Sequence, residues 1–324
     1  MTSGEENDRA AASAPASIGN VGVGFDVLGQ AFDAVRDTVV ALREAAPGVR
    51  LGMVSGLVTS LPATPETNTA LASARALLDA AGADFGVRLS IDKGVPISAG
   101  MGGSAASAVA AVAAVNALLP DPLALEDLLP FALEGERVSS DPPPWDNVAA
   151  ALHGGLVLVA REEFDGVHRL PAPKDLVAIL FHPPVRIETN AARQLLQPAV
   201  PMRTAVEHSR RMAAFVAGCA SGDHALLRAG LEDLLVEPQR AHLLPALGAV
   251  KQAALRAGAL GCSFSGSGPA VFVWAPLAQA EAVGAAMAEA FHAASLHARA
   301  YRAPVDSAGV RLESLVDPSC QRAA

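Results

Sequence analysis

A glycine-rich stretch that runs directly into an alanine-rich stretch constrains this chain more than any other feature of its sequence. Residues 94–104 read Gly-Val-Pro-Ile-Ser-Ala-Gly-Met-Gly-Gly-Ser, and residues 105–119 are almost all alanine, valine and leucine. The second stretch predicts a buried helix that ends before Pro120. Glycines let backbone N–H groups approach an anion closely, and a helix N-terminus adds about half a positive charge. The pattern therefore predicts a phosphate-binding loop at the start of a buried helix.

Neither of the common nucleotide-binding motifs fits this loop. It lacks the Gly-Lys-Ser/Thr ending of a Walker loop and does not match Gly-x-Gly-x-x-Gly at the start of a βαβ unit. Taken alone, it is also compatible with a strand-to-helix turn in which Ser104 only caps the helix. Two further loops are rich in small residues and also have ordinary structural explanations. Residues 14–26 are compatible with an Asx turn, and residues 262–273 are compatible with a hairpin turn.

Charge and composition exclude several classes of partner. The 324 residues include 24 Lys plus Arg and 33 Asp plus Glu, a formal net charge of −9, so general attraction to nucleic acid or anionic lipid is not expected. The first residues lack the positive region of a signal peptide, and the apolar stretch at 105–119 is shorter than the roughly 20 residues of a membrane span. We expect a cytoplasmic protein that binds neither nucleic acid nor membranes.

The chain mixes expected strands with expected helices in both halves. Residues 1–13 are polar and small and predict a flexible arm, and a proline-rich link at 170–173 predicts a domain boundary. The expected domains are therefore 14–171 and 172–324. Apolar patterning predicts strands at 38–42, 87–91, 156–160, 176–181 and 271–274, and helices at 69–81, 105–119, 123–138, 188–196, 203–219, 222–235, 244–257 and 278–293.

Three glycine-rich loops in this order and at these separations resemble the GHMP family of small-molecule kinases. Within that family, the opening PASIGNVGVGFDVLG at residues 15–29 is similar to the homoserine kinase version. So are four shorter motifs: Glu66-Thr-Asn-Thr69, Trp145-Asp-Asn-Val148, Glu237-Pro-Gln-Arg240 and Phe264-Ser-Gly-Ser-Gly-Pro269. The resemblance covers about residues 14–312. It implies an α+β fold with an N-terminal ribosomal-protein-S5-like domain, a C-terminal ferredoxin-like domain and a site at their junction.

The resemblance also implies the activity and its ligands. A homoserine kinase uses ATP and Mg²⁺ to phosphorylate the hydroxyl of L-homoserine, giving O-phospho-L-homoserine for threonine biosynthesis, and members of the family are often homodimers. The triphosphate maps to the central loop and the first turn after it, which comprise Pro96, Ile97, Ser98, Ala99, Gly100, Met101, Gly102, Gly103, Ser104, Ala105 and Ala106.

The Mg²⁺ site implied by the resemblance pairs Ser104 with Glu136. By composition Glu134 serves equally well, and only the family spacing prefers Glu136. Asn68 matches the family's adenine-side asparagine, although capping the helix expected at 69–81 explains it as well. Lys93 either lends charge to the triphosphate or is a strand-end lysine that extends its amine to water.

Homoserine is a zwitterion, so its site needs cations for the carboxylate and an anion for the ammonium. Arginine supplies planar bidentate geometry for a carboxylate. The family pattern gives that role to Arg193 and Arg240, makes Asp26 the ammonium partner, and makes Asn20 and Asn147 neutral groups that orient the substrate. Thr189 is expected near the reacting centre, so that the expected catalytic set is Asn20, Ser104, Glu136 and Thr189.

A catalytic base is left open. Asp146 stands in an Asp-Asn pair comparable to that of sugar and mevalonate kinases, which use an aspartate base, but homoserine kinases are not expected to require one. Phosphoryl transfer has a loose transition state, so positioning and charge neutralisation supply most of the acceleration.

Two segments depart from the family pattern. The family loop usually ends in Gly-Ser-Ser, whereas this one ends Gly102-Gly103-Ser104, and a stiff Pro142-Pro-Pro-Trp145 run replaces small residues before Asp146. The second departure affects the rim of the substrate site, and two alternatives for the function stay open. One is a GHMP kinase for another substrate, of the mevalonate type, and the other is a catalytically silent member that binds ATP or an amino acid.

Overall fold

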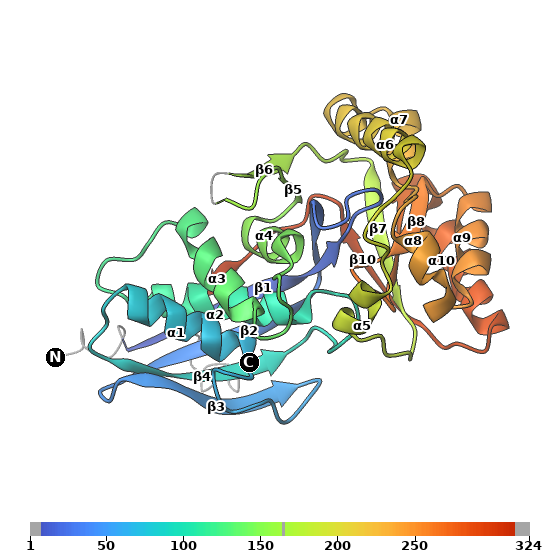
Figure 1. Cartoon of the computed structure of the whole chain (residues 1–324). Coiled ribbons are helices and arrows are strands. Elements are labelled where there is room, and N and C mark those ends of the chain that lie inside the picture. The colour runs from blue at the N-terminus through green and yellow to red at the C-terminus, as the bar shows by residue number, and fades with distance from the viewer. Residues whose placement is uncertain (1–7, 164–165, 315–324) are drawn as a thin grey trace.

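The computed structural model describes residues 8–163 and 166–314, which form two β-sheets with helices packed against them (Figure 1). The first sheet has seven strands in the order β11-β1-β2-β4-β3, with β5 pairing with β2 and β6 pairing with β5. Its pairs are antiparallel except β3 with β4. Its strands are β1 (Arg9–Gly19), β2 (Leu28–Glu44), β3 (Gly48–Gly56), β4 (Gly86–Lys93), β5 (Leu156–Val159), β6 (Val167–Leu170) and β11 (Arg311–Glu313).

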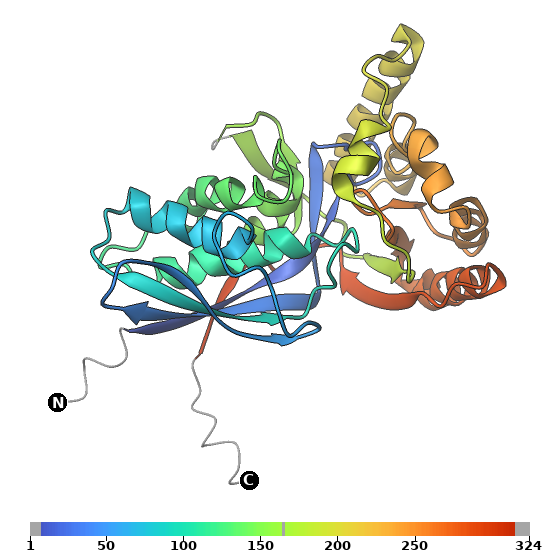
Figure 2. The ribbon, with the colours of Figure 1, turned by 60° about the horizontal axis from the view of Figure 1, so that its bottom comes forward.

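Four helices lie over one face of the first sheet (Figure 2). They are α1 (Thr69–Ala80), α2 (Gly103–Asn116), α3 (Leu129–Glu136), which follows a 3₁₀ turn at Leu125–Leu128, and α4 (Trp145–His153). Every residue of α2 from Ala105 to Asn116 is buried. Its alanines let α1 and strands β1 and β2 approach closely, which confirms the expected buried helix after the glycine-rich loop.

The second sheet is antiparallel, with strand order β10-β7-β9-β8. Its strands are β7 (Leu176–His182), β8 (Gly261–Phe264), β9 (Val271–Pro276) and β10 (Arg299–Pro304). Side chains alternate along β7: Ile179 and Phe181 pack with the helices of this half, whereas Ala178 and Leu180 join the core that the second sheet shares with the first. Burial on both faces explains why β7 is apolar along its length.

Four of the six described helices of the second half fall into two groups. Helices α9 and α10 pack on one face of the second sheet, and α6 and α7 pack against each other (Figure 1). The helices are α5 (Thr189–Gln194), α6 (Met202–Ser221), α7 (His224–Gly230), α8 (Glu237–Arg240), α9 (Leu247–Arg256) and α10 (Ala280–Ala293), with 3₁₀ turns at Ala241–Leu243 and Leu277–Gln279. No described helix combines the length and apolar character that crossing a bilayer requires.

Direct bonds join the two sheets. The indole Nε1 of Trp274 in β9 donates to Oε1 of Gln30 in β2 at 2.8 Å, and both side chains are completely buried. Nearby, the amide of Gly266 donates to the carbonyl of Gly19 at 2.9 Å. The glycine-rich loop at 94–103 is also bound to this segment, because the Ser265 hydroxyl donates to the carbonyl of Gly100 at 2.6 Å and the amide of Ala270 donates to the carbonyl of Ala99 at 3.1 Å.

The flexible arm expected at residues 1–13 is wrong for residues 9–13. Strand β1 begins at Arg9, and its residues from Ala11 onward are buried between β2 and β11. The segment is rich in alanine and serine, so its sequence carries no apolar alternation that would predict a strand. Residues 1–7 lie outside the described part of the chain. The domain boundary at 171/172 stays a prediction; the first sheet takes its strands from residues 9–170 and also from β11.

Several expected helices differ from the structure in extent. The helix expected at 105–119 is α2, Gly103–Asn116, and the helix expected at 244–257 is α9, Leu247–Arg256. The helix expected at 123–138 is a 3₁₀ turn followed by α3, because Pro130 fits only the first turn of an α-helix. The helix expected at 222–235 ends at Gly230, and the helix expected at 188–196 is the short α5. The strand expected at 38–42 is the middle of the 17-residue β2.

Candidate functional site

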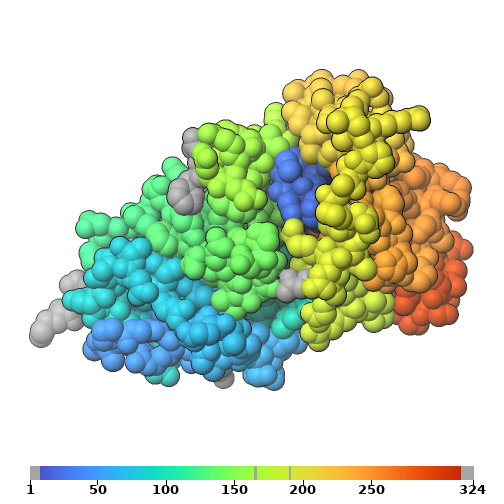
Figure 3. Space-filling model, in the orientation of Figure 1, coloured from blue at the N-terminus to red at the C-terminus, as the bar shows by residue number. Residues whose placement is uncertain are grey.

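A cleft of about 400 Å³ lies where the glycine-rich loop, the start of α4 and the start of α5 meet. Figure 3 shows the face on which the green surface of α3 and α4 approaches the yellow-green surface around α5. All of the expected site residues from Asn20 to Arg240 line this cleft except Pro96 and Ala106, which belong to the loop and helix beside it. The structure therefore gathers residues that lie more than 200 positions apart in the sequence.

Three residues of the glycine-rich loop adopt left-handed backbone conformations. Gly100 and Gly102 have φ of 73° and 63°, and Ser98 has φ of 52°. A Cβ at Gly102 would lie 1.9 Å from Oγ of Ser17, so only glycine fits there. No side chain of a described residue caps the N-terminus of α2, so the amides of its first turn are available to an anion.

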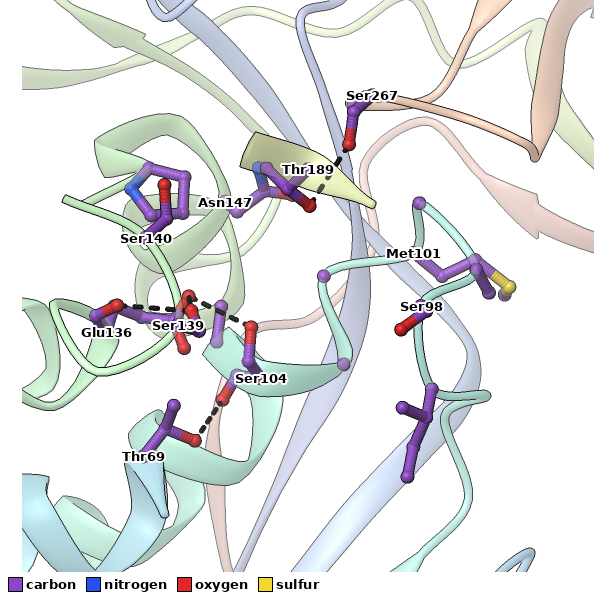
Figure 4. Close-up of a pocket in the computed structure, with 18 of the residues that line it drawn as sticks. Thr69, Ser98, Met101, Ser104, Glu136, Ser139, Ser140, Asn147, Thr189 and Ser267 are labelled. Carbon is purple, nitrogen blue, oxygen red and sulfur yellow. Dashed lines mark hydrogen bonds between the residues drawn. The ribbon is translucent and has the colours of Figure 1, made fainter. Parts of the chain in front are cut away.

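Ser104 and Glu136 meet at one wall of the cleft, as Figure 4 shows. The Ser104 hydroxyl donates to Oε2 of Glu136 at 2.9 Å, and Ser139 donates to the same oxygen at 3.1 Å. The other oxygen, Oε1, is buried without a hydrogen-bond partner among the described residues. Burial raises the pKa of Glu136 to about 7. A buried carboxylate oxygen without a donor, next to a hydroxyl, suits a hard cation such as Mg²⁺.

The alternative carboxylate, Glu134, lies outside this arrangement. Its side chain is 62% exposed and pairs with Arg137 at 3.1 Å. The geometry therefore separates two residues that composition alone could not distinguish.

Asn68 caps helix α1. Its Oδ1 accepts the amides of Ala70 and Leu71 at 3.0 and 3.3 Å, and its Nδ2 donates to the carbonyl of Pro62 at 2.8 Å. The capping alternative is thus present in the structure, and the expected contact with adenine stays a prediction.

Lys93 is not a strand-end lysine that reaches water, because its side chain is only 4% exposed. Its ammonium donates to the carboxylate of Asp37, which the sequence analysis did not identify. One signal could have found Asp37: it lies in phase with the buried Val39 and Ala41 on β2, where a charged residue requires a partner.

Charged side chains gather around the ring of Phe25 at another part of the cleft. Arg193 makes a bidentate pair with Asp26, with N–O distances of 2.8 and 3.0 Å, and this hydrogen bonding raises the pKa of Arg193. The guanidinium carbons of Arg193 and Arg240 each lie 5.5 Å from the ring centroid. Asp26 and Arg193 were expected to bind opposite groups of the substrate, and the structure pairs them with each other.

Arg240 is 2% exposed, and Nε donates to the carbonyl of Ala192 at 3.0 Å. Its two terminal nitrogens have no hydrogen-bond partner within the described chain, although the residue lines the cleft. Burial lowers the pKa of Arg240 to about 10. The cleft thus holds a largely desolvated guanidinium fork without a bonded carboxylate, which suits an anionic ligand.

Asn20 and Asn147 hold the loops of the site together. The amide group of Asn20 accepts from the backbone N–H of Asp26 at 2.9 Å and donates to the carbonyl of Gly266 at 3.0 Å. Oδ1 of Asn147 accepts from the hydroxyl of Ser17 at 2.9 Å. Their expected contacts with substrate stay predictions, because these side chains already bond to the protein.

Asp146 is completely buried between these two asparagines. It accepts from the backbone amides of Asn20 and Asn147, each at 2.8 Å. Burial, and secondly the negative charge of Asp26, raises the pKa of Asp146 to about 7. Thr189, at the start of α5, accepts a hydrogen bond from Ser267 at 3.2 Å and lies across the cleft from Ser104 (Figure 4).

Known proteins match this chain along nearly its whole length. The family description "GHMP kinases N terminal domain" matches residues 68–155, and "GHMP kinases C terminal" matches residues 213–293. A homoserine kinase of Xylella fastidiosa (strain 9a5c) is 44% identical over 305 residues, which is 94% of each chain. A homoserine kinase of Chlorobaculum tepidum is 38% identical over 93% of this chain and 97% of the relative.

Solved structures agree. The crystal structure of homoserine kinase from Cytophaga hutchinsonii has a TM-score of 0.89 and 38% identity, covering 94% of this chain and 98% of that one. The mevalonate kinase of L. major, at a TM-score of 0.68 and 17% identity, covers 91% of this chain and 96% of that one and shares the fold.

Proposed function

Because this chain belongs to the GHMP kinase family, and within it to the homoserine kinases, we propose that it transfers the γ-phosphoryl group of ATP to the hydroxyl of L-homoserine. The products are ADP and O-phospho-L-homoserine, an intermediate of threonine biosynthesis. The observation that carries the choice of substrate is the joint presence of Asp26 and the unbonded fork of Arg240 in the cleft that also contains the phosphate loop.

We propose that the ATP triphosphate binds along residues 96–106. The left-handed turns of the loop and the uncapped start of α2 supply amide donors without a Walker lysine. The apolar side chains of Leu61, Pro62 and Ile97 line the same cleft and suit an adenine ring.

Ser104 and Glu136 would hold Mg²⁺. The unpartnered Oε1 of Glu136 and the hydroxyl of Ser104 are hard oxygen donors of the kind this ion prefers. When bound, the ion neutralises charge on the outer phosphates. Ser139 supports the site by donating to the same carboxylate, which fixes its orientation.

The zwitterionic end of the substrate would meet both signs of charge. Each carboxylate oxygen of Asp26 accepts one hydrogen bond from Arg193. A carboxylate oxygen can accept a second hydrogen bond, so Asp26 can also bind an ammonium group. Arg240 offers its terminal nitrogens to the substrate carboxylate, and Arg193 stands beside it to share that role. Mevalonate has a carboxylate but no ammonium, so it would leave Asp26 without its second partner.

The chain's own residues orient the reactants for in-line transfer. The substrate hydroxyl oxygen bonds to the γ-phosphorus, the bond from that phosphorus to the β–γ bridging oxygen breaks, and the hydroxyl proton passes to solvent. Asn20 holds Asp26 through a hydrogen bond to its amide, and Thr189 lies across the cleft from Ser104. Because the transition state is loose, orientation and charge neutralisation carry the reaction without a strong base.

Release of ADP from Mg-ATP tests the proposal. We expect turnover with L-homoserine and none above background with mevalonate, shikimate or galactose. Preferred turnover of mevalonate would establish a GHMP kinase of the mevalonate type. Binding of homoserine without ADP release would establish a catalytically silent binding protein. The family resemblance also supports a cytoplasmic location and a homodimer, and light scattering of the purified protein at micromolar concentration tests the homodimer.

A further inference from the structure

A buried polar cluster lies directly beneath the phosphate loop. Asp37 is completely buried, and Lys93 and Ser107 are 3% and 5% exposed. The Lys93 ammonium donates to Asp37, to Oγ of Ser107 at 2.9 Å and to the carbonyl of Gly103 at 2.8 Å. A lysine ammonium has three donors, so these contacts use all of them.

The carboxylate of Asp37 reaches both ends of the loop. Its Oδ1 accepts the amides of Gly94 and Val95 at 3.1 and 2.9 Å, where the loop begins. Its Oδ2 accepts from the ammonium of Lys93, at the end of β4. The same oxygen accepts from the Ser107 hydroxyl at 2.6 Å, and Ser107 lies in the first two turns of α2, the helix that follows the loop. One carboxylate on β2 therefore connects β4, the start of the loop and helix α2.

We propose that Asp37 and Lys93 are positioning residues for ATP: the buried ion pair holds both ends of the phosphate loop so that its amides converge on the triphosphate. Lys93 acts through the loop and not by contacting phosphate. The inference rests on the proposed function, since it takes ATP as the ligand of the loop.

The contacts favour this role over a direct one. Although Lys93 lines the cleft, its charge is neutralised by Asp37, and its remaining donors hold Gly103 and Ser107. Lys93 could donate a hydrogen bond to a phosphate only if one of these bonds inside the protein broke. That change would leave a buried acceptor without a donor. The amides of the loop, in contrast, require no rearrangement.

The decisive variant is Asp37→Asn, assayed by calorimetric titration with a non-hydrolysable ATP analogue in Mg²⁺ and, separately, with homoserine. We expect the Kd of the analogue to rise at least tenfold and that of homoserine to change less than twofold, because Asp26, Arg193 and Arg240 belong to other segments. The matched control is Asp92→Asn, the exposed neighbour of Lys93 on β4, which should change neither Kd.

The opposite result has a distinct signature. If Asp37→Asn retains the wild-type Tm and binds the analogue as tightly as wild type or more tightly, the released ammonium contacts phosphate directly and the proposal fails. Equal weakening of both ligands would show a general structural role and would also refute it.

Ser107→Ala keeps the test decisive if Asp37→Asn does not fold. This variant leaves both charges in place and removes one link between Asp37 and α2. We expect amide hydrogen exchange at Gly94 and Val95 to accelerate about tenfold and the Kd of the analogue to rise about threefold; no change in either refutes the clamp. ADP release by the wild-type enzyme is measured independently, so failure of the proposed activity is distinguishable from failure of this inference.

Discussion

Arg240→Met gives a two-sided test of the charged end of the cleft, because it should weaken substrate binding while stabilising the fold. In the free protein the guanidinium is 2% exposed, and its described polar contact is the 3.0 Å bond to Ala192. Methionine is unbranched and of similar length, so it can replace the aliphatic stem without a large cavity. The substitution therefore removes mainly the charge.

The magnitude follows from the pKa of Arg240, which burial lowers from 12.5 to about 10. Because the folded-state pKa lies below the unfolded value, the charged form is disfavoured in the fold, and the cost applies in full below pH ~10 and is relieved only above it. A shift of this size corresponds to roughly 3 kcal/mol at neutral pH. Losing the bond to Ala192 and the contact of the guanidinium with the Phe25 ring offsets about 1.5 kcal/mol. The net gain of about 1.5 kcal/mol should raise Tm by roughly 2 to 3 °C.

The substrate side is measured with homoserine and with 3-aminopropan-1-ol, which lacks the carboxylate. Loss of charge-assisted hydrogen bonds worth about 1.5–3 kcal/mol predicts a rise in KM for homoserine of roughly 10- to 150-fold. The KM for 3-aminopropan-1-ol should not change. Arg256→Met, on the exposed face of α9, is the control and should leave Tm and both KM values near wild type. An unchanged KM for homoserine, or an equal rise for both acceptors, would refute the assignment, and a lower Tm would refute the desolvation argument.

Three further substitutions test other parts of the cleft. Asp26→Asn should remove about 1.5–3 kcal/mol of binding free energy and thereby raise the KM for homoserine. The KM for 4-hydroxybutyrate, which lacks the ammonium, should change little. Glu136→Ala should lower kcat at least about 100-fold by removing a metal ligand, whereas Glu134→Ala should matter little in the same ADP-release assay. Gly102→Ala should abolish binding of the ATP analogue, because its Cβ would collide with Ser17.

For each of these three predictions, one experimental outcome would contradict it. Equal effects of Asp26→Asn on both acceptors would remove Asp26 from the ammonium site, and equal effects of the two glutamate variants would mean that Glu136 is not the ligand. The control for Gly102→Ala is Gly82→Ala, which has a similar φ of +60° but nothing within 4 Å of the added Cβ. Gly82→Ala should bind the analogue like wild type, and if Gly102→Ala binds it equally well, the collision with Ser17 does not disrupt the loop and the prediction fails.

The glycine-rich loop and the buried helix after it were predictable from the sequence because their signal is local. The glycines, the alanine-rich helix and Ser104 are contiguous, so spacing alone predicts their arrangement. Strand β7 was predictable for a similar reason, since an apolar run of that length fits a strand buried on both faces. Strand β1 was missed in part because alanines and serines carry no periodic signal, although the structure buries them.

The contacts that organise the site were less accessible to sequence. Asp37 and Lys93 lie on antiparallel strands 56 residues apart, and their pairing depends on the register of β2 with β4, in which Thr38 faces Asp92. Asp26 and Arg193 were both assigned to the substrate site, but their mutual ion pair follows from how the second half of the chain packs on the first. Spacing along a chain does not encode such long-range packing.

The hydrogen bond between Trp274 and Gln30 turns one of the chain's two tryptophans into an optical probe of the junction. Its indole is completely enclosed and donates to a residue of the other sheet, whereas Trp145 is partly exposed at the start of α4, next to residues that line the cleft. In a Trp145→Phe variant, the remaining emission arises from Trp274 alone. A blue-shifted spectrum that resists acrylamide quenching then reports that the halves are joined, and a red shift during denaturation reports the moment at which they separate.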